Sequence, residues 1–253
     1  MLPFLPTRRA LLGAGLGLKI RPAPPNIILI VTDDQRWDAL GCHEEPVTLG
    51  FLRTPNMDRL AAEGVRFRNA FVTTSLCSPS RASVLTGQYA STHGVESLEG
   101  DLAPGAVTFP ALLRRAGYET AYIGKYHLGK DSDRPRPEYN HWAVFRGQGD
   151  YSNPTINVNG ISSQATGYVT DVLTDQAIEF VTRRRARPFF LQLGHKAPHS
   201  PVVPPKHLER LYDGLTVPLP ATYGEGHADK PGWFLEQHDH DYFHVLLHPR
   251  EKY

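Results

Sequence analysis

Apolar positions recur along the chain in two periods, which predicts strands that alternate with helices. Residues 26–32 form a continuous β-branched run, which is typical of a strand buried on both faces of a parallel sheet. We expect further strands at residues 65–72, 119–125 and 188–194. We expect helices at residues 54–64, 108–118 and 170–186. The last helix carries an apolar face of Val172, Leu173, Ala177, Phe180 and Val181. This alternation predicts an α/β fold whose mainly parallel sheet is sandwiched by helices.

Chemically active side chains follow each predicted strand. In chain order they are Asp33 and Asp34; Cys77; Lys125, His127 and Lys130; and His195, Lys196 and His199. Each group alone also fits a helix cap, a turn or a solvated face. Ligands of parallel sheets bind beyond the carboxyl ends of the strands, so four such groups favour one shared site.

Cys77 stands where a helix is expected to begin. Ser78 can cap this helix and Pro79 suits its first position, which places Cys77 at the positive end of the helix dipole. Arg81 follows one turn later, and one interpretation is a thiolate beside a bound oxyanion. A thiol phosphatase, however, needs five residues between cysteine and arginine, and here there are three. The adjacent carboxylates of Asp33 and Asp34 favour a hard cation such as Ca²⁺, which prefers oxygen ligands.

The segment Cys77-Ser78-Pro79-Ser80-Arg81, which continues to Leu85-Thr86-Gly87, resembles the signature of type I, formylglycine-dependent sulfatases. In that family the cysteine is oxidised to Cα-formylglycine after translation. Residues 26–35, 54–67, 124–130 and 197–201 resemble further sulfatase segments in the same order. Residues 157–160, 167–175 and 197–201 are most similar to N-acetylglucosamine-6-sulfatases. The fold implied is that of the alkaline phosphatase and sulfatase superfamily.

The resemblance also implies a role for each site residue. Asp33, Asp34 and residue 77 would bind Ca²⁺, and the hydrated aldehyde at residue 77 would attack sulfur. The substrate would be a sulfated sugar, with the 6-O-sulfate of N-acetylglucosamine as the implied example. Arg81 would hold residue 77, Lys125 would contact sulfate, and His127 would orient the hydrated aldehyde. His199 would contact sulfate or assist the leaving group, and Lys196 is a further substrate-binding candidate. Lys130 and His195 are weaker candidates, and Cys42 is expected to be a small core residue.

One part of the family pattern is missing. The family supplies a second pair of metal ligands and a further lysine from segments after residue 201, and residues 213–253 contain nothing like them. The run His238 to Asp241 is interpreted as polar surface rather than as a replacement metal site. We therefore expect an N-terminal fragment whose C-terminal part is missing, and negligible turnover by the 253 residues alone.

Composition and the N-terminal residues indicate which classes of binding partner and which cellular location to expect. The chain has 27 basic and 26 acidic residues, which gives no electrostatic reason to expect binding to nucleic acid. Arg8-Arg9 before a short apolar run resembles a twin-arginine export signal, and that run is too short to span a bilayer. We therefore expect residues 1–25 to be export signal and linker and residues 26–253 to be catalytic domain. The expected location is periplasmic or secreted, and the expected partner is a formylglycine-generating maturation enzyme.

Two alternatives remain open on the sequence. The superfamily shares its metal chemistry, so the same site could hydrolyse a phosphonate or phosphate ester. The chain could also be an inactive remnant that binds sulfate or sugar.

Export can be tested at the two arginines. Replacing both Arg8 and Arg9 by Lys is expected to retain the protein in the cytoplasm, because the twin-arginine pathway reads the arginine pair. The measurement is fractionation of cells that express either form. Unchanged export of the double variant would refute the assignment.

Overall fold

The computed structural model describes residues 23–43, 51–216 and 231 of the 253 residues. The described residues form two compact units, one of residues 23–36 with 67–210 and one of residues 37–43 and 51–66 with 211–216 and 231. In the second unit, helix α1 (Pro55–Glu63) begins after Thr54 with Pro55 in its first turn and ends at Gly64. The expected export signal lies outside the described residues, except for the linker residues 23–25. No helix within the described ranges is long and apolar enough to cross a bilayer.

A six-stranded sheet forms the centre of the first unit. In spatial order its strands are β1 (Ile27–Val31), β6 (Phe189–Gly194), β2 (Glu119–Lys125), β3 (His141–Phe145), β4 (Thr155–Val158) and β5 (Ile161–Gln164). The first four strands run parallel to one another, β4 pairs antiparallel with β3, and β5 pairs antiparallel with β4. The prediction of a mainly parallel α/β sheet is confirmed.

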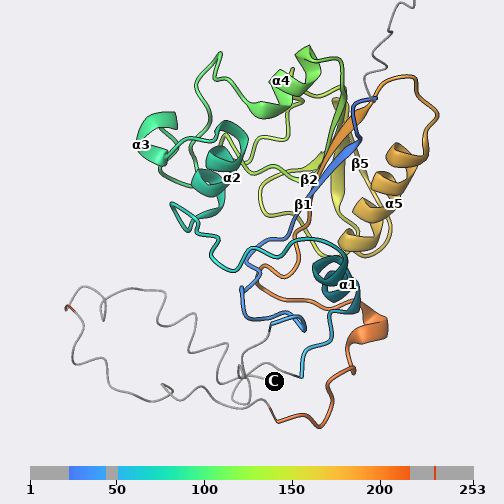
Figure 1. Ribbon diagram of the computed structural model, residues 1–253. Helices are drawn as coiled ribbons and strands as arrows, with labels where there is room; N and C mark the ends of the chain where they lie inside the picture. Colours follow the sequence, from blue (N-terminus) through green and yellow to red (C-terminus); the bar gives the residue numbers. More distant parts are fainter. Residues whose placement is uncertain (1–22, 44–50, 217–230, 232–253) are drawn as a thin grey trace, which may run out of the picture. The chain divides into compact units, whose positions relative to one another are not determined.

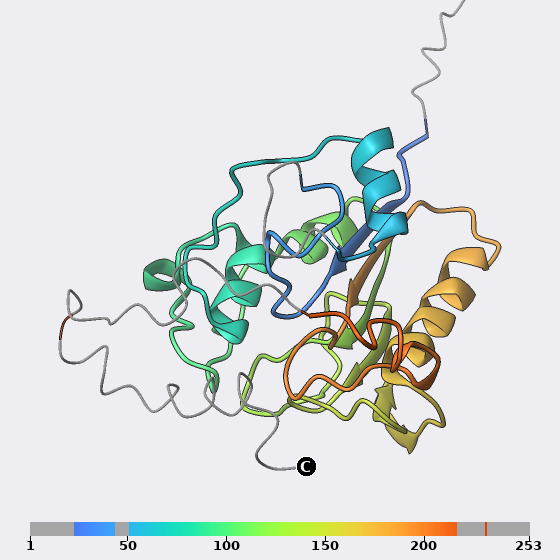
Figure 2. The same ribbon diagram turned by 90° about the horizontal axis from the view of Figure 1, so that it is seen from below.

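Helices cover both faces of this sheet (Figure 1). Helix α5 (Val169–Thr182) packs on one face, and the group α2 (Cys77–Thr86), α3 (Ala90–His93) and α4 (Phe109–Arg115) lies on the other, as the turned view also shows (Figure 2). A short 3₁₀ helix, Lys206–Leu208, follows the last strand. Alternate residues of each central strand belong to two buried clusters. Ala121 and Ile123 face the α5 side, whereas Tyr122 between them joins the other cluster.

The predicted helices and strands are mostly present. Helix α4 is capped by the hydroxyl of Thr108, which accepts from the amide of Ala111, and β2 follows as expected. Helix α5 buries Leu173, Ala177 and Phe180, the centre of the predicted apolar face. It ends at Thr182 rather than residue 186, and Arg185 stacks over the rings of Phe180 and Phe189 instead of continuing the helix.

Two expectations about the fold were wrong, and four short elements were not expected. Residues 65–72 form no strand, and Phe67 and Phe71 are 80% and 88% exposed, because the alternating segment finds no neighbouring strand among the described residues. One face of strand β1 is not covered by other described residues, so Ile28 and Ile30 are more than half exposed, whereas Ile27 and Leu29 on the other face pack against a buried cluster. The short elements β3, β4, β5 and α3 were not expected, since their periodic segments are only four or five residues long.

A glycine pair leaves no room for a side chain between two strands at the end of the sheet where the polar residues gather. Gly124 of β2 and Gly194 of β6 are partners in the ladder. Gly124 has φ +105°, and a Cβ on it would overlap the carbonyl oxygen of Gly194. A Cβ on Gly194 would come within 2.7 Å of the carbonyl oxygen of Lys125. The absence of side chains here therefore sets the position of Lys125 at the strand end.

Substituting Gly124 tests this close approach. Gly124→Ala is expected to lower the free energy of unfolding by more than about 3 kcal/mol, because it adds backbone overlap to the strain of a positive φ. The matched control is Gly105→Ala, where φ is +84° and nothing lies within 4 Å of the added Cβ. That change is expected to cost about 1–2 kcal/mol. Equal losses in chemical denaturation of the two variants would contradict the explanation.

Candidate active site

Asp33 is a buried carboxylate that two cations hold. It follows β1, and its amide donates to the carbonyl oxygen of Ala197 at 3.2 Å. Arg81 Nη2 lies 2.9 Å from Oδ1, and Lys125 Nζ donates to Oδ2. The three residues are at most 8% exposed. Burial alone would raise the pKa of Asp33, but the guanidinium and the ammonium outweigh it and hold that pKa below its usual value.

Arg81 is fixed by a second set of contacts. Its Nη1 donates to the carbonyl oxygen of Lys125 at 2.5 Å and to the hydroxyl of Tyr122 at 3.4 Å. The Tyr122 hydroxyl donates to the same Lys125 carbonyl at 2.6 Å. Tyr122 is therefore part of the support of the site, although its sequence position indicates only a strand residue. The network joins α2 to the end of β2.

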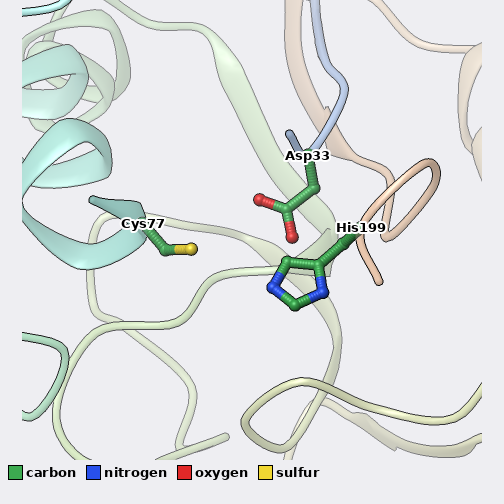
Figure 3. A group of neighbouring side chains, drawn as sticks. All are labelled: Asp33, Cys77 and His199. Carbon is green, nitrogen blue, oxygen red and sulfur yellow. The ribbon is translucent and has the colours of Figure 1, made fainter. Parts of the chain in front are cut away.

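Cys77 is the first residue of α2 and faces Asp33 (Figure 3). Its Sγ lies 3.9 Å from Lys125 Nζ, and ligand atoms of Asp33, Cys77 and His199 all lie within 4.8 Å of one another. Burial, with the carboxylates of Asp33 and Asp34, raises the pKa of the Cys77 thiol, and Lys125 and Arg81 offset this only in part. The group is thus a protonated thiol at neutral pH, which does not fit the thiolate interpretation.

Ser78 does not cap the helix, contrary to expectation. The N-cap residue is Leu76, so Cys77 lies inside the first turn rather than before it. The Ser78 hydroxyl instead points into the protein, within hydrogen-bond distance of the carbonyl oxygens of His127 at 2.7 Å and Leu98 at 3.0 Å. It anchors the start of α2 to the segment that follows β2.

His127 is a neutral imidazole at physiological pH. It is 7% exposed and has φ 53°, and its Nδ1 has no hydrogen-bond partner among the described residues. Burial, together with the charges of Lys125 and Arg81, lowers the pKa of His127 to about 4. The backbone carbonyl of His127 accepts a hydrogen bond from the Ser78 hydroxyl, whereas its ring Nδ1 makes none with the described residues.

His199 approaches the cluster from the loop after β6. Its Nδ1 lies 2.5 Å from the carbonyl oxygen of Ser200, which can only accept, so the proton of the neutral ring resides on Nδ1. Its Nε2 lies 3.5 Å from Asp34 Oδ2. The Tyr151 hydroxyl donates to the His199 carbonyl at 2.6 Å. His199 therefore presents Nε2 toward the partly exposed Asp34.

Lys196 is also buried near this cluster, at 3% exposure. Its Nζ donates to the carbonyl oxygen of Gln148 at 3.0 Å and lies 4.8 Å from the centre of the Tyr151 ring. The side chain of Gln148 accepts from Lys125 Nζ at 2.5 Å. Gln148 and Tyr151 were not singled out from the sequence because β3, the strand before them, was not expected. The sequence feature that could have pointed to Gln148 is the Gly-Gln-Gly run at residues 147–149.

The structure does not join the remaining candidates to the cluster. Lys130 is exposed, and its Nζ lies 3.8 Å from a Glu99 carboxylate oxygen. His195 is tied to β1 through its amide, which donates to the Val31 carbonyl, and its Nδ1 has no partner in the described part of the chain. Cys42 is partly exposed in the second unit and not a core residue, and its carbonyl oxygen accepts from Arg66 Nη1 at 3.0 Å. Residues 238–241 lie outside the described residues.

The carboxylate oxygens near Cys77 are of the type that a hard cation prefers as ligands. Asp33 and Asp34 offer carboxylate oxygens, the ligands Ca²⁺ prefers, whereas the sulfur of an unmodified Cys77 does not suit it. Both oxygens of Asp33 already face Arg81 and Lys125, so a cation there would compete with two fixed charges. The described residues also offer fewer oxygens than the six to eight that calcium takes. The described residues therefore provide part of the ligand set of a calcium site.

Comparison with known proteins identifies relatives. The family model described as Sulfatase matches residues 25–225. An N-acetylglucosamine-6-O-sulfatase of Bacteroides thetaiotaomicron is 38% identical over 202 residues, which cover 78% of this chain and 35% of that protein. An N-acetylgalactosamine-6-sulfatase of Canis lupus familiaris is 32% identical over 231 residues, with 75% and 42% covered. The chain thus spans well under half the length of these relatives.

Solved structures agree on the fold. A protein in complex with its substrate D-glucosamine-2-N,6-O-disulfate superposes with a TM-score of 0.72 at 37% identity, covering 78% of this chain and 39% of that one. A phosphonate monoester hydrolase of Agrobacterium radiobacter gives a TM-score of 0.60 at 23% identity, covering 78% and 45%. The second likeness concerns the fold alone.

The neutral state of His127 predicts a pH dependence of stability. Because its folded pKa lies below the ordinary value of 6.5, its contribution is present above pH 6.5 and is lost as pH falls toward 4. His127→Asn removes the titrating ring and tolerates the positive φ. The loss of unfolding free energy between pH 7 and 4 is expected to be about 1–2 kcal/mol smaller in this variant. Denaturation across this range, with exposed His207→Asn as control, measures it. Parallel curves for wild type and His127→Asn would disprove the assignment.

Proposed function

Because the chain belongs to the sulfatase family, we propose that it carries the nucleophile half of a site that hydrolyses sulfate esters of sugars. The observation that carries the proposal is the convergence of Arg81, Lys125 and His199 on Asp33 and Cys77. A sulfate ester gains negative charge on its leaving oxygen during cleavage, and preorganised cations stabilise that charge. The same groups attract the dianionic sulfate that is released.

The proposed substrate is a sugar sulfated at the 6-position, such as N-acetylglucosamine 6-sulfate. The names of the bacterial relative and of the substrate in the solved complex support this choice. The related enzyme that acts on N-acetylgalactosamine supports the position of the sulfate more than the identity of the sugar.

Residue 77 is proposed to act after conversion of Cys77 to Cα-formylglycine. As a protonated thiol it is a weak nucleophile and a poor neighbour for a hard cation. The hydrated aldehyde supplies an oxygen nucleophile for sulfur and a second hydroxyl through which sulfate is later released. Its place in the first turn of α2 keeps this oxygen beside Lys125 and at the positive end of the helix.

Calcium is proposed to be held by Asp33, Asp34 and the oxygen of residue 77, and when bound it supplies positive charge next to the sulfate.

The other roles in the proposed reaction belong to side chains around residue 77. Lys125 Nζ donates to sulfate oxygens, and Lys196 adds a second ammonium at the same side. Arg81 holds residue 77 and offsets its charge, and the neutral His127 ring orients it without adding charge. His199 holds Nδ1–H against Ser200, so its Nε2, once protonated, can donate to the leaving sugar oxygen.

The other parts of the proposal concern partners and location. Residues 26–253 are proposed to be the catalytic portion, and residues 1–25 an export signal and linker for the twin-arginine route. Conversion of Cys77 requires a formylglycine-generating maturation enzyme as a transient partner. The sulfated carbohydrate is the substrate partner.

Mass and turnover test the proposal together. The 253-residue chain and the full-length protein proposed to contain it are each coexpressed with the maturation enzyme. The intact mass of each is expected to be lower than that of the unconverted form by the difference between a thiol and an aldehyde. The protein is expected to hydrolyse an aryl sulfate and N-acetylglucosamine 6-sulfate, and a chelator is expected to abolish both activities. Cys77→Ala should reduce turnover on the order of 10³-fold or more.

The matched control is Cys42→Ala, which should leave both conversion and turnover unchanged. An aryl phosphonate assayed beside the aryl sulfate separates the two ester classes. Faster cleavage of the phosphonate, or full sulfatase activity in Cys77→Ala, would contradict the proposed function.

A further inference from the structure

Gln148 accepts hydrogen bonds from both buried lysines of the site. Its side-chain Oε1 accepts from Lys125 Nζ at 2.5 Å, and its backbone carbonyl accepts from Lys196 Nζ at 3.0 Å. The two lysines come from different strand ends, β2 and β6, which are neighbours in the sheet. A single residue in the loop between β3 and β4 therefore links two cations that would otherwise repel each other.

The backbone around Gln148 is held in one conformation. Gly147 and Gly149 flank it with φ +55° and +61°. A Cβ on Gly147 would overlap the carboxylate of Asp131, and a Cβ on Gly149 would overlap the ring of Phe145, which is 1% exposed in the core. The Gly149 amide also donates to the Arg146 carbonyl at 3.1 Å. The turn is thus packed against the core and the next loop, so it can fix the direction of the Gln148 side chain.

The Lys125 ammonium has three N–H donors, and the structure accounts for each. One donates to Asp33 Oδ2, one to Gln148 Oε1, and the third side of the group faces Cys77 Sγ at 3.9 Å. Two acceptors that fix two of the donors also fix the direction of the third. Without the Gln148 acceptor the ammonium could rotate about its last bond and turn away from residue 77.

We propose that Gln148 is a positioning residue that orients the ammonium groups of Lys125 and Lys196 toward a sulfate bound at residue 77. The inference rests on the proposed function, because it assigns the two lysines to sulfate. The neutrality of the glutamine amide is part of the argument. A carboxylate at this position would also hold Lys125, but it would cancel the positive charge that draws an anion to the site.

Gln148→Met tests the inference, because methionine keeps a similar length and removes the acceptor. In the protein that carries this chain, converted at residue 77, we expect kcat for an aryl sulfate to fall about 10- to 100-fold, the scale of a misplaced catalytic group. We expect the inhibition constant of inorganic sulfate to rise while the melting temperature stays near that of wild type. Gln148→Asn, whose amide is one methylene too short to reach Lys125, should change both quantities in the same direction and covers the case in which Gln148→Met does not fold. Gln164→Met, an exposed glutamine on β5, is the matched control and should change neither.

A double-mutant cycle shows whether Gln148 acts through Lys125. Calorimetry with inorganic sulfate is compared for wild type, Gln148→Met, Lys125→Met and the double variant. We expect Gln148→Met to weaken sulfate binding in the wild-type background, and to have much less effect once Lys125 is replaced. Unchanged kcat and sulfate affinity in folded Gln148→Met, or fully additive effects, would overturn the inference and leave the proposed function intact. A wild-type protein that neither binds sulfate nor cleaves the ester would overturn both.

Discussion

The ion pairs of Asp33 with Arg81 and Lys125 are the interaction on which the site depends. Three charged groups that are almost fully buried carry a large desolvation cost, which is offset only if each charge is paired and hydrogen-bonded. Removing one partner would leave an unpaired charge in the interior. The network therefore constrains the ends of β1 and β2 and the first turns of α2 to meet, and Cys77 is carried into position with them.

Backbone geometry makes this meeting possible. The close approach of Gly124 to Gly194 places the carbonyl of Lys125 within reach of both Tyr122 and Arg81, so a main-chain oxygen completes the support of the guanidinium. The positive φ of His127 turns the chain immediately afterwards, and its carbonyl lies within reach of the Ser78 hydroxyl. The site is thus built from strand ends and a helix start, and few of its contacts come from flexible surface side chains. The loop after β3 adds Gln148 and Tyr151, which reach the two segments that follow β2 and β6.

Much of this arrangement could be predicted from the sequence, and the failures have physical causes. Long periodic segments and the rule that ligands bind at carboxyl ends of parallel strands were enough to group Asp33, Lys125, Lys196 and His199. The sequence argument for Cys77 is wrong locally, since the strand expected at residues 65–72 does not form and Ser78 is not the helix cap. Gln148 and Tyr122 could not be identified from the sequence. The role of Gln148 arises from tertiary contacts of the loop after the short strand β3, and that of Tyr122 from tertiary contacts inside the buried strand β2. The exposure of Ile28 and Ile30 depends on what packs over that face of β1 in the described structure, which the local pattern does not reveal.

The central claim is that the cations around residue 77 form the binding place of the sulfate group. A crystal structure of the protein grown with inorganic sulfate tests it most directly. We expect a sulfate whose oxygens lie within hydrogen-bond distance of Lys125 Nζ and close to residue 77, with the pair of Arg81 and Asp33 still formed. A sulfate bound elsewhere while this place holds none, or a Lys125 ammonium turned away from residue 77, would contradict it.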